Sequence, residues 1–370
     1  MKILIIPEYG TYGGALTFLK RLLYIHNKNK IETAVLIQKN QQIPEIIALF
    51  KDSGIKVFVS TNRFKLFLHP LFSPLFDLFF CWKAFAEYHP NIIIISNTSP
   101  GIMLSVLFFP VPVLFVMHSY PRGKMPLPVR IMCRMASRYN NRFVTVSKFS
   151  KENIHRFMGV PREHIEVIYT SAKPIQTHTT SENAHILTIG HVVWYKDPEC
   201  WLNVARKVID KKQEVRFLWV GDGELLNSFK VRIHELGLER RIVMCGFSNQ
   251  IENYYADALI YFQPSLVESH GISVVEAMAH GLPCVTSDAG GLPESVVNGE
   301  TGFTCPPGDV NCFVSHINKL LDDDELREKM GRFGKLRAET LFSEELQEKK
   351  MICLYTSLLQ KWVSKCPTTN

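Results

Sequence analysis

The sequence predicts an α/β protein of two doubly wound domains, each with a parallel sheet that has helices on both faces. Short, continuously apolar runs alternate with longer amphipathic segments along the chain, which is the pattern of repeated β–α units. The length of 370 residues corresponds to two domains at about 150 residues each. Residues 1–180 carry 22 basic and 9 acidic side chains, and residues 181–370 carry 20 basic and 26 acidic ones. The halves, at +13 and −6, therefore differ by 19 charges, which predicts two domains with different partners.

The first domain is predicted to span residues 1–172. A glycine-containing loop at 9–15 leads into a helix at 16–27, and a shorter helix is expected at 102–109. Residues 90–121 carry no Asp, Glu, Lys or Arg, but residues 97–101, Pro110 and Pro112 interrupt this apolar stretch. A membrane-spanning helix needs about 20 apolar residues without repeated breakers, so two buried strands are expected here instead. The expected strands lie at 2–7, 33–38, 56–60, 92–96, 111–118 and 143–147.

The second domain is predicted to span residues 185–343, after a polar linker at 170–185. The segment at 344–370 follows this domain, and an amphipathic helix at 344–363 within it is expected to pack back on the first domain. The expected strands lie at 185–190, 215–221, 242–246, 258–264 and 283–288, and the expected helices lie at about 199–212, 225–236, 271–280 and 310–320.

Composition excludes a disordered chain, a collagen-like chain and a small secreted scaffold. The nine cysteines form no C-x-x-C pair and no zinc-finger spacing, which predicts reduced, mostly buried thiols. At the N-terminus a single Lys precedes five apolar residues, too few for a signal peptide. We therefore expect a cytoplasmic protein.

A basic surface is predicted in the first domain. Residues 122–162 hold ten Lys or Arg and one acidic residue, Glu152, and the segment upstream at 64–82 is rich in Phe. Taken separately, the basic residues are explained by a solvated helix face and the Phe-rich segment by a piece of core. Taken together, the two features resemble an interfacial surface that contacts an anionic membrane or an acceptor. Such a surface would place the protein at the inner face of the membrane. No nucleic-acid-binding motif is present, so no nucleic acid is expected as a partner. Four arginines recur every fourth residue and are expected near one helix face: Arg130, Arg134, Arg138 and Arg142.

The strongest chemical signal lies at residues 264–294. Glu268 and Glu276 are eight residues apart, and Gly271 between them is expected to open a helix that carries Glu276. The backbone N–H groups at a helix N-terminus form an anion site. Carboxylates beside phosphate are unfavourable unless they meet hydroxyls, so the combination indicates a nucleotide-sugar. Lys196 follows the first strand of this domain, at the edge where open α/β sheets bind ligands, and suits a diphosphate; a plain surface lysine is the alternative.

These residues carry a resemblance to the retaining glycosyltransferases of family 4, which have the GT-B fold. The resemblance rests, in order and spacing, on GHVVWYK, VGDGE, PSLVESHGISVVEAMAHGLPCV, GGLPE and NGETGF, with a looser match in the first domain at GTYGGA, HSY and VTVSKFSKENI. It implies two facing Rossmann-like domains with an interdomain cleft, the acceptor bound by the first domain and the nucleotide-sugar by the second. It also implies sugar transfer with retention of anomeric configuration and no bound metal or other cofactor.

Site residues follow from the same resemblance. Glu268 would contact the donor sugar, Glu276 the donor ribose, and Lys196 the diphosphate of a UDP- or GDP-sugar. His118 resembles the family's histidine near the reacting carbon. Backbone groups would approach the phosphates at Gly13, Gly14, Gly271, Ile272 and Ser273.

Three positions depart from the family pattern. His191 stands where the family usually has an Arg that grips the diphosphate, and an Arg fork stays charged where His is neutral near pH 7. His270 replaces a frequent Phe, and Thr170-Ser171 replaces an Asn-Gly pair.

Because of the departure at His191, the alternative interpretation is an inactive family member that serves as a binding or partner subunit. A nicotinamide-dependent oxidoreductase is disfavoured because YGTYGGA lacks G-x-G-x-x-G. The acidic run at residues 322–325 contains a formal D-x-D but is expected to be the acidic start of a helix, so no metal is predicted. The main prediction is a metal-independent glycosyltransferase with a lipid-linked or membrane-proximal glycan acceptor, as in cell-surface polysaccharide synthesis.

Overall fold

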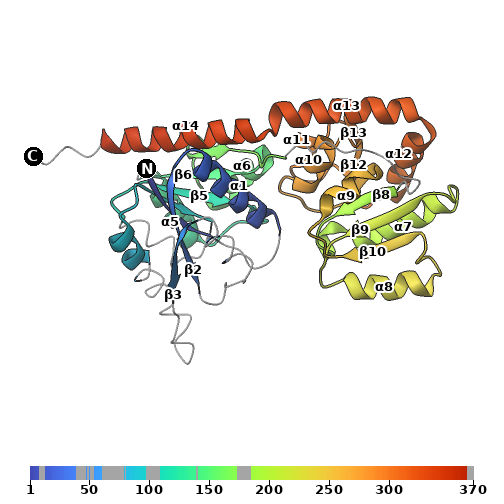
Figure 1. Ribbon diagram of the computed structural model, residues 1–370, viewed down its shortest axis with the longest axis horizontal. Helices are drawn as coiled ribbons and strands as arrows, with labels where there is room; N and C mark the ends of the chain where they lie inside the picture. The colour runs from blue at the N-terminus through green and yellow to red at the C-terminus, as the bar shows by residue number, and fades with distance from the viewer. Residues whose placement is uncertain are drawn as a thin grey trace, which may run out of the picture. The chain divides into compact units, whose positions relative to one another are not determined.

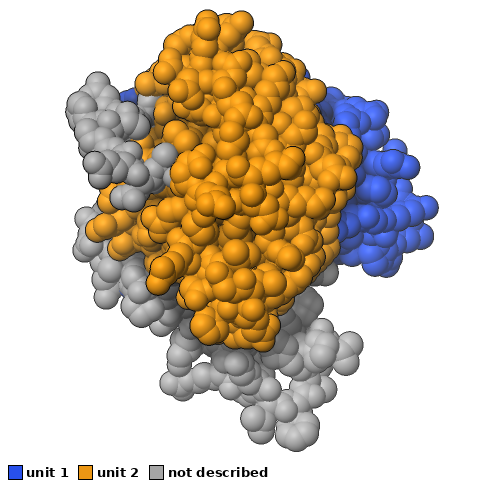
Figure 2. Space-filling model, turned by 90° about the vertical axis from the view of Figure 1, so that its right-hand side faces the viewer, with its two compact units in different colours: residues 1–168, 348–370 blue, residues 169–347 orange. Residues whose placement is uncertain are grey.

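The computed structural model describes residues 1–7, 13–38, 47, 50, 54–60, 79, 81–96, 109–138, 141–172 and 185–364. The chain divides into two compact units, coloured separately in Figure 2: unit 1 comprises residues 1–168 and 348–370, and unit 2 comprises residues 169–347. The predicted domain boundaries were 172, 185 and 344. The predicted helix at 102–109, and most of the Phe-rich segment and of the linker, lie outside the described residues.

Unit 1 contains a parallel sheet with the strand order β3-β2-β1-β4-β5-β6-β7. Figure 1 labels β2, β3, β5 and β6 of this sheet. Six of its described strands match the predicted ones, and the unpredicted seventh is only three residues long. The strands are β1 (Lys2–Ile6), β2 (Glu32–Gln38), β3 (Lys56–Ser60), β4 (Ile92–Ile95), β5 (Val113–Met117), β6 (Arg142–Thr145) and β7 (Ile165–Val167).

Both faces of the unit 1 sheet are buried, as the continuously apolar strands require. In β1, Ile3 and Ile5 pack against α1 (Gly14–Lys28) and α14 (Glu344–Val363). Leu4 and Ile6 belong to the core on the opposite face, which includes residues of α5 (Leu127–Arg138). The last helix of the chain therefore completes the core of the first unit, as the sequence predicted.

Unit 2 repeats this architecture with the strand order β10-β9-β8-β11-β12-β13, again all parallel. One face packs against α7, α8 and α12, and the other against α10 and α13. The two sheets confirm the predicted α/β fold. The strands are β8 (His185–Ile189), β9 (Arg216–Val220), β10 (Ile242–Gly246), β11 (Ala258–Gln263), β12 (Cys284–Ser287) and β13 (Gly302–Cys305). The helices are α7 (Pro198–Ile209), α8 (Leu226–Glu235), α9 (Ile251–Ala256), α10 (Ile272–Ala279), α11 (Leu292–Ser295), α12 (Val310–Asp322) and α13 (Asp324–Leu341).

Two expectations are corrected. The four arginines do not share one helix, because α5 ends at Arg138 and Arg142 begins strand β6. The thiols are not all reduced: Cys305 and Cys312 form a disulfide, since β13 and α12 bring their Cα atoms to 5.9 Å, within the range that a disulfide spans. Cys133, Cys200 and Cys284 are free and buried, as expected.

No helix within the described ranges combines the length and the apolar character needed to cross a membrane.

A buried histidine ties α14 to unit 1. The ring nitrogens of His26 lie 2.9 Å from the hydroxyl of Thr33 and 2.9 Å from that of Tyr355 on α14. Burial lowers the pKa of His26 to about 3, so the imidazole is neutral in the folded protein at neutral pH. One ring nitrogen then donates a hydrogen bond and the other accepts one.

Acidification is expected to destabilise unit 1 through His26. Below pH 6.5 the unfolded chain binds a proton that the folded protein, with a His26 pKa of about 3, does not bind. The free energy of unfolding therefore falls by at most about 1.4 kcal/mol per pH unit between pH 6.5 and pH 3. Between pH 7.5 and 5.5, Tm of the wild type should fall further than Tm of His26→Gln. The control His234→Gln, at an exposed position, should fall like the wild type; an equal fall in all three proteins would refute the assignment.

Candidate functional site

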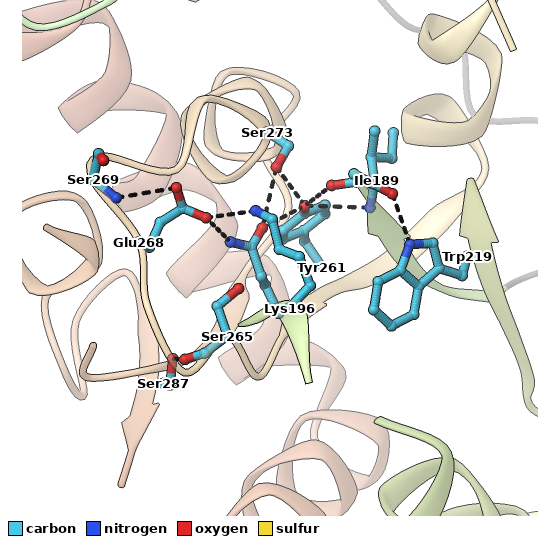
Figure 3. Close-up of polar contacts among 11 residues, drawn as sticks. Ile189, Lys196, Trp219, Tyr261, Ser265, Glu268, Ser269, Ser273 and Ser287 are labelled. Atoms are coloured by element: carbon cyan, nitrogen blue, oxygen red, sulfur yellow. Dashed lines mark hydrogen bonds and ion pairs between the residues drawn. The ribbon is translucent and has the colours of Figure 1, made fainter. Parts of the chain in front are cut away.

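The candidate site of unit 2 centres on an ion pair at the carboxyl edge of the sheet. Lys196 ends a 3₁₀ turn (Trp194–Lys196) after β8, and Glu268 lies in the segment after β11. The Lys196 Nζ atom is 2.5 Å from Glu268 Oε2, and the two side chains are 13% and 15% exposed. Figure 3 shows the ammonium and the carboxylate pointing toward each other. A charge this deeply placed needs a partner, and each residue supplies it for the other.

A polar network behind this pair fixes the carboxylate. Gln263, the last residue of β11, donates from Nε2 to Glu268 Oε2 at 3.0 Å. Its Oε1 lies 2.9 Å from the hydroxyl of buried Tyr261 and 3.1 Å from that of Ser273. Glu268 Oε1 accepts the backbone N–H of Ser269 at 3.2 Å. Both carboxylate oxygens therefore have protein donors, which orients Glu268 before any ligand arrives.

Helix α10 begins at the predicted place and carries the second carboxylate. Gly271 caps the helix in the left-handed region, with φ 81°. The first N–H groups of an α-helix have no partner within the helix, so those of Gly271, Ile272 and Ser273 form the positive end of α10. Glu276 lies one turn farther on, half-buried, and accepts a hydrogen bond of 3.2 Å from the Tyr255 hydroxyl. Burial and this carboxylate raise the pKa of Tyr255 well above its usual value, so the hydroxyl stays a donor.

The backbone of the GGLPE segment contacts the backbone of Glu268. The N–H of Gly291 donates to the Glu268 carbonyl at 3.0 Å. At Gly290, where φ is 62°, a Cβ atom would lie 2.0 Å from the same carbonyl oxygen. Only glycine permits this approach, so the turn after β12 and the Glu268 segment are packed backbone to backbone.

His191 is held by the neighbouring loop. Its Nδ1 lies 3.2 Å from the carbonyl oxygen of Asp222, in the VGDGE segment after β9. Because a carbonyl only accepts, Nδ1 carries the hydrogen, and Nε2 donates to an anion only when the ring is protonated. An arginine at this position would be a donor at every pH.

His270 keeps the aromatic character of the position it occupies. Its ring stacks on Tyr169, with centroids 5.3 Å apart, and contacts Phe342. The histidine at this position therefore packs against aromatic side chains beside the site.

The predicted site residues of unit 1 lie near the carboxyl ends of its strands. Gly13 caps α1, and Gly14 is its first residue; both are exposed. His118 directly follows β5, and its ring meets Phe18 of α1 edge-on at 5.0 Å. Burial lowers the pKa of His118 to about 4, so the imidazole is neutral at pH 7.

The arginines predicted to form an interfacial surface separate in the fold. Arg134 is exposed on α5 and Arg130 is half-buried there, whereas the Arg142 guanidinium lies 3.0 Å from the Asn141 carbonyl oxygen and 3.0 Å from a ring nitrogen of His164. The Arg138 side chain lies outside the described atoms.

Helix α5 instead exposes an apolar stripe that the sequence analysis missed. Leu127, Ile131 and Met135 are 65%, 50% and 38% exposed. Their spacing of four residues was the available signal.

The acidic run at 322–325 starts a helix, as predicted. Asp323 caps α13 by accepting the N–H of Leu326 at 2.9 Å, and Asp324 and Glu325 lie in the first turn. The sulfur atoms of Cys305 and Cys312 and a nitrogen of His316 are the only group of metal-ligand type in the part of the chain that the structure describes.

Sequence reasoning missed Tyr255, Tyr261 and Gln263. Tyr261 and Gln263 are two residues apart at the end of the buried run ALIYFQ, so their side chains lie on the same face of the strand. Polar groups within such an apolar run were the available signal for a functional role. Tyr255 gave no signal, because nothing in the sequence pairs it with Glu276.

Two family models match the chain. A model described as glycosyl transferases group 1 matches residues 171–337, which include Lys196, Glu268 and Glu276. A model described as Glycosyltransferase Family 4 matches residues 12–172.

Curated relatives match parts of the chain. N-acetyl-alpha-D-glucosaminyl L-malate synthase of Bacillus anthracis is 30% identical over 145 residues, which cover 39% of this chain and 37% of the relative. The capsular polysaccharide biosynthesis glycosyltransferase CapM of Staphylococcus aureus is 25% identical over 219 residues, which cover 59% of this chain and 56% of CapM. The matches thus span about a third to about half of these relatives.

Solved structures match nearly the whole fold. A glycosyltransferase from Rickettsia africae has a TM-score of 0.82 at 18% identity, and the match covers 97% of this chain and 98% of that one. Anabaena HepE in complex with UDP and glucose has a TM-score of 0.80 at 20% identity, with 96% and 100% covered.

The contact at Gly290 gives a matched pair of variants. Ala at Gly290 or at Gly299 places a side chain in the left-handed region, which costs about 1–2 kcal/mol, but at Gly299 no atom lies within 4 Å of the new Cβ. Gly290→Ala should therefore lower Tm clearly further than Gly299→Ala, because it also displaces the Glu268 backbone. Equal thermal shifts would contradict the packed contact.

Proposed function

The chain belongs to the group 1 glycosyltransferases, and we propose that it is an active enzyme that uses a nucleotide diphosphate sugar. In this proposal it transfers the sugar, with retention of anomeric configuration, to a lipid-linked or membrane-proximal glycan, as in cell-surface polysaccharide synthesis. The observation that carries the proposal is the site of unit 2, where a partly buried Lys196–Glu268 pair, the N-terminus of α10 and Glu276 lie together. An inactive relative would have no evident need to keep a lysine and a carboxylate at this depth.

Each group of the site suits one part of a nucleotide-sugar. The positive end of α10 and Lys196 favour a diphosphate. Glu276, whose carboxylate already accepts from Tyr255, has further acceptor capacity for the two ribose hydroxyls, and Glu268 suits hydroxyls of the sugar. UDP and GDP are the proposed nucleotides; HepE was solved with UDP, which makes UDP the first to test.

Catalysis is proposed to be electrostatic and positional. As the bond between sugar and diphosphate breaks, negative charge grows on the leaving phosphate, where Lys196 and the helix N–H groups stabilise it. No side chain of the site is placed as an evident nucleophile, and a departing phosphate oxygen is proposed to take the acceptor proton. His118, neutral at pH 7 because of its low pKa, is assigned a hydrogen bond to sugar or acceptor. These groups provide the stabilising charge without a bound metal.

The acceptor proposal rests on α5. Leu127, Ile131 and Met135 expose an apolar stripe on its solvent side, and Arg134 is exposed beside them. Apolar side chains next to basic charge are typical of a surface that lies in an anionic membrane interface. We therefore assign an anionic lipid surface as the neighbour of this helix and place the protein at the inner face of the membrane.

The second candidate, an inactive binding or partner subunit, is favoured only by His191. Calorimetric titration with nucleotide-sugars separates the two, since an inactive partner subunit need not bind the donor. No binding of any UDP- or GDP-sugar would favour the second candidate.

Removal of either charged group should abolish activity. Lys196→Ala is expected to lower kcat/KM for donor hydrolysis or sugar transfer by about 100-fold or more, because charge stabilisation at a leaving group is worth about 3–4 kcal/mol. Glu276→Ala should also lower kcat/KM strongly, because the ribose hydroxyls lose their proposed acceptor. The control Glu235→Ala, in the last turn of α8, should retain activity. Full activity in both site variants would refute the proposed function.

Arginine at position 191 should strengthen donor binding. His191→Arg introduces a permanent charge and a planar fork for phosphate, so we expect a Kd for UDP or GDP about tenfold lower than that of the wild type, measured by calorimetry. An unchanged Kd would mean that position 191 does not contact the diphosphate.

The α5 stripe should govern membrane binding. In sedimentation with vesicles of phosphatidylglycerol and phosphatidylcholine, the wild type should bind less as salt rises, because screening weakens the electrostatic part. The triple variant Leu127→Ser, Ile131→Ser and Met135→Ser should lose most binding, whereas Val231→Ser, at an exposed position on α8, should not. Equal binding by all three proteins would exclude this surface.

A further inference from the structure

A second chemical cluster lies at the carboxyl end of β13, the edge strand that neighbours β12 in the unit 2 sheet. Cys305 ends strand β13, Cys312 lies in the first turn of α12, and a disulfide joins them. The Nδ1 atom of His316, one turn farther along α12, is 3.3 Å from the Cys305 sulfur and 3.6 Å from the Cys312 sulfur. Neither the family resemblance nor the proposed reaction uses these three residues.

The two sulfur atoms have unequal access. Cys305 is fully buried, whereas Cys312 is partly exposed. The Cys312 N–H donates to the capping carboxylate of Asp309 at 3.0 Å, so its thiol belongs to the N-terminal turn of a helix, a position that favours a thiolate. Cys312 is therefore the sulfur that a small thiol or disulfide can reach.

His316 is placed to take the proton of the Cys305 thiol, because its Nδ1 atom lies 3.3 Å from that sulfur. Its ring is held in place by stacking on Phe303, with centroids 4.2 Å apart, and Lys319 lies above the same phenyl ring.

Backbone hydrogen bonds connect this cluster with the Glu268 segment. The Cys305 carbonyl accepts the N–H of Asp288 at 2.8 Å, directly after β12. Three residues on, Gly291 donates to the Glu268 carbonyl at 3.0 Å. A constraint on the end of β13 is thus transmitted to the turn at 288–291, which supports Glu268.

We propose that Cys305 and Cys312 form a reversible, redox-sensitive disulfide, with His316 as its proton acceptor, that tightens nucleotide binding by fixing the end of β13. Disulfides in a reducing compartment are usually transient or redox-sensing, which suits a pair with one accessible sulfur. The effect on nucleotide binding rests on the proposed function; formation of the disulfide does not.

Oxidation proceeds by thiol–disulfide exchange with a small disulfide such as oxidised glutathione. The Cys312 thiolate attacks one glutathione sulfur, forms a mixed disulfide and releases one glutathione thiolate. His316 takes the proton of the Cys305 thiol, and the resulting thiolate attacks the Cys312 sulfur, which releases the second glutathione thiolate. The protein loses two electrons and two protons, and one oxidised glutathione becomes two reduced molecules.

Differential alkylation of the full-length protein tests the disulfide. We would equilibrate it in mixtures of reduced and oxidised glutathione, in a Cys353→Ser background because Cys353 is an exposed free thiol, and map the blocked thiols by mass spectrometry. Cys305 and Cys312 should become protected together and be released together by dithiothreitol. His316→Phe, which keeps a ring against Phe303, should slow oxidation at pH 7 about tenfold.

Independent alkylation of the two thiols would overturn the proposal. So would stoichiometric zinc, retained by the reduced protein and blocking both thiols, because the cluster would then be a metal site. For the coupling, calorimetry with UDP and with GDP should give a Kd at least threefold lower for the oxidised protein, and Cys312→Ser should match the reduced protein. Equal Kd values for the oxidised and the reduced protein would refute the effect of the disulfide on nucleotide binding. If neither form bound UDP or GDP, the proposed function would be refuted as well. The alkylation experiment tests formation of the disulfide independently of nucleotide binding.

Discussion

The site of unit 2 depends on the need to compensate a carboxylate that is largely shielded from water. Glu268 and Lys196 are each largely shielded from water, and either charge alone would be costly at that depth. The same requirement explains the residues around them, since Gln263 donates to the carboxylate and is itself oriented by Tyr261 and Ser273. A charged pair that already has its hydrogen bonds is also pre-organised, which is the property that electrostatic catalysis requires.

The parallel arrangement of the strands decides where this pair can stand. All carboxyl ends of a parallel sheet meet at one edge, so the turn after β8, the segment after β11 and the turn after β12 are neighbours although they are far apart in sequence. The same rule in unit 1 places His118, after β5, beside Phe18 of α1. Burial then keeps that imidazole neutral, because its pKa falls to about 4. Two copies of one architecture thus carry groups of different electrostatic character.

Backbone contacts link the site to the remainder of unit 2. Gly290 permits the turn after β12 to touch the Glu268 backbone, and the carbonyl of Cys305 holds the start of that turn. The disulfide and His316 therefore lie within the same hydrogen-bonded framework as the carboxylate, although they are chemically separate from it. A change of covalent state at β13 has a defined physical route to the proposed donor site.

The sequence by itself determined the fold class, most strands and the start of α10, because apolar periodicity and helix-start signals are local properties of the chain. It singled out Lys196 and Glu268, but only the structure showed that they form an ion pair. It also predicted that the last helix packs on the first unit, where Met351 and Tyr355 complete the core. Local patterns misled at Arg142, because a spacing of four residues persists across the end of a helix. Only the tertiary structure decided the roles of Tyr255, Tyr261 and Gln263, the disulfide of Cys305 with Cys312, and the proximity of His316, because each depends on atoms that meet only once the strands are side by side.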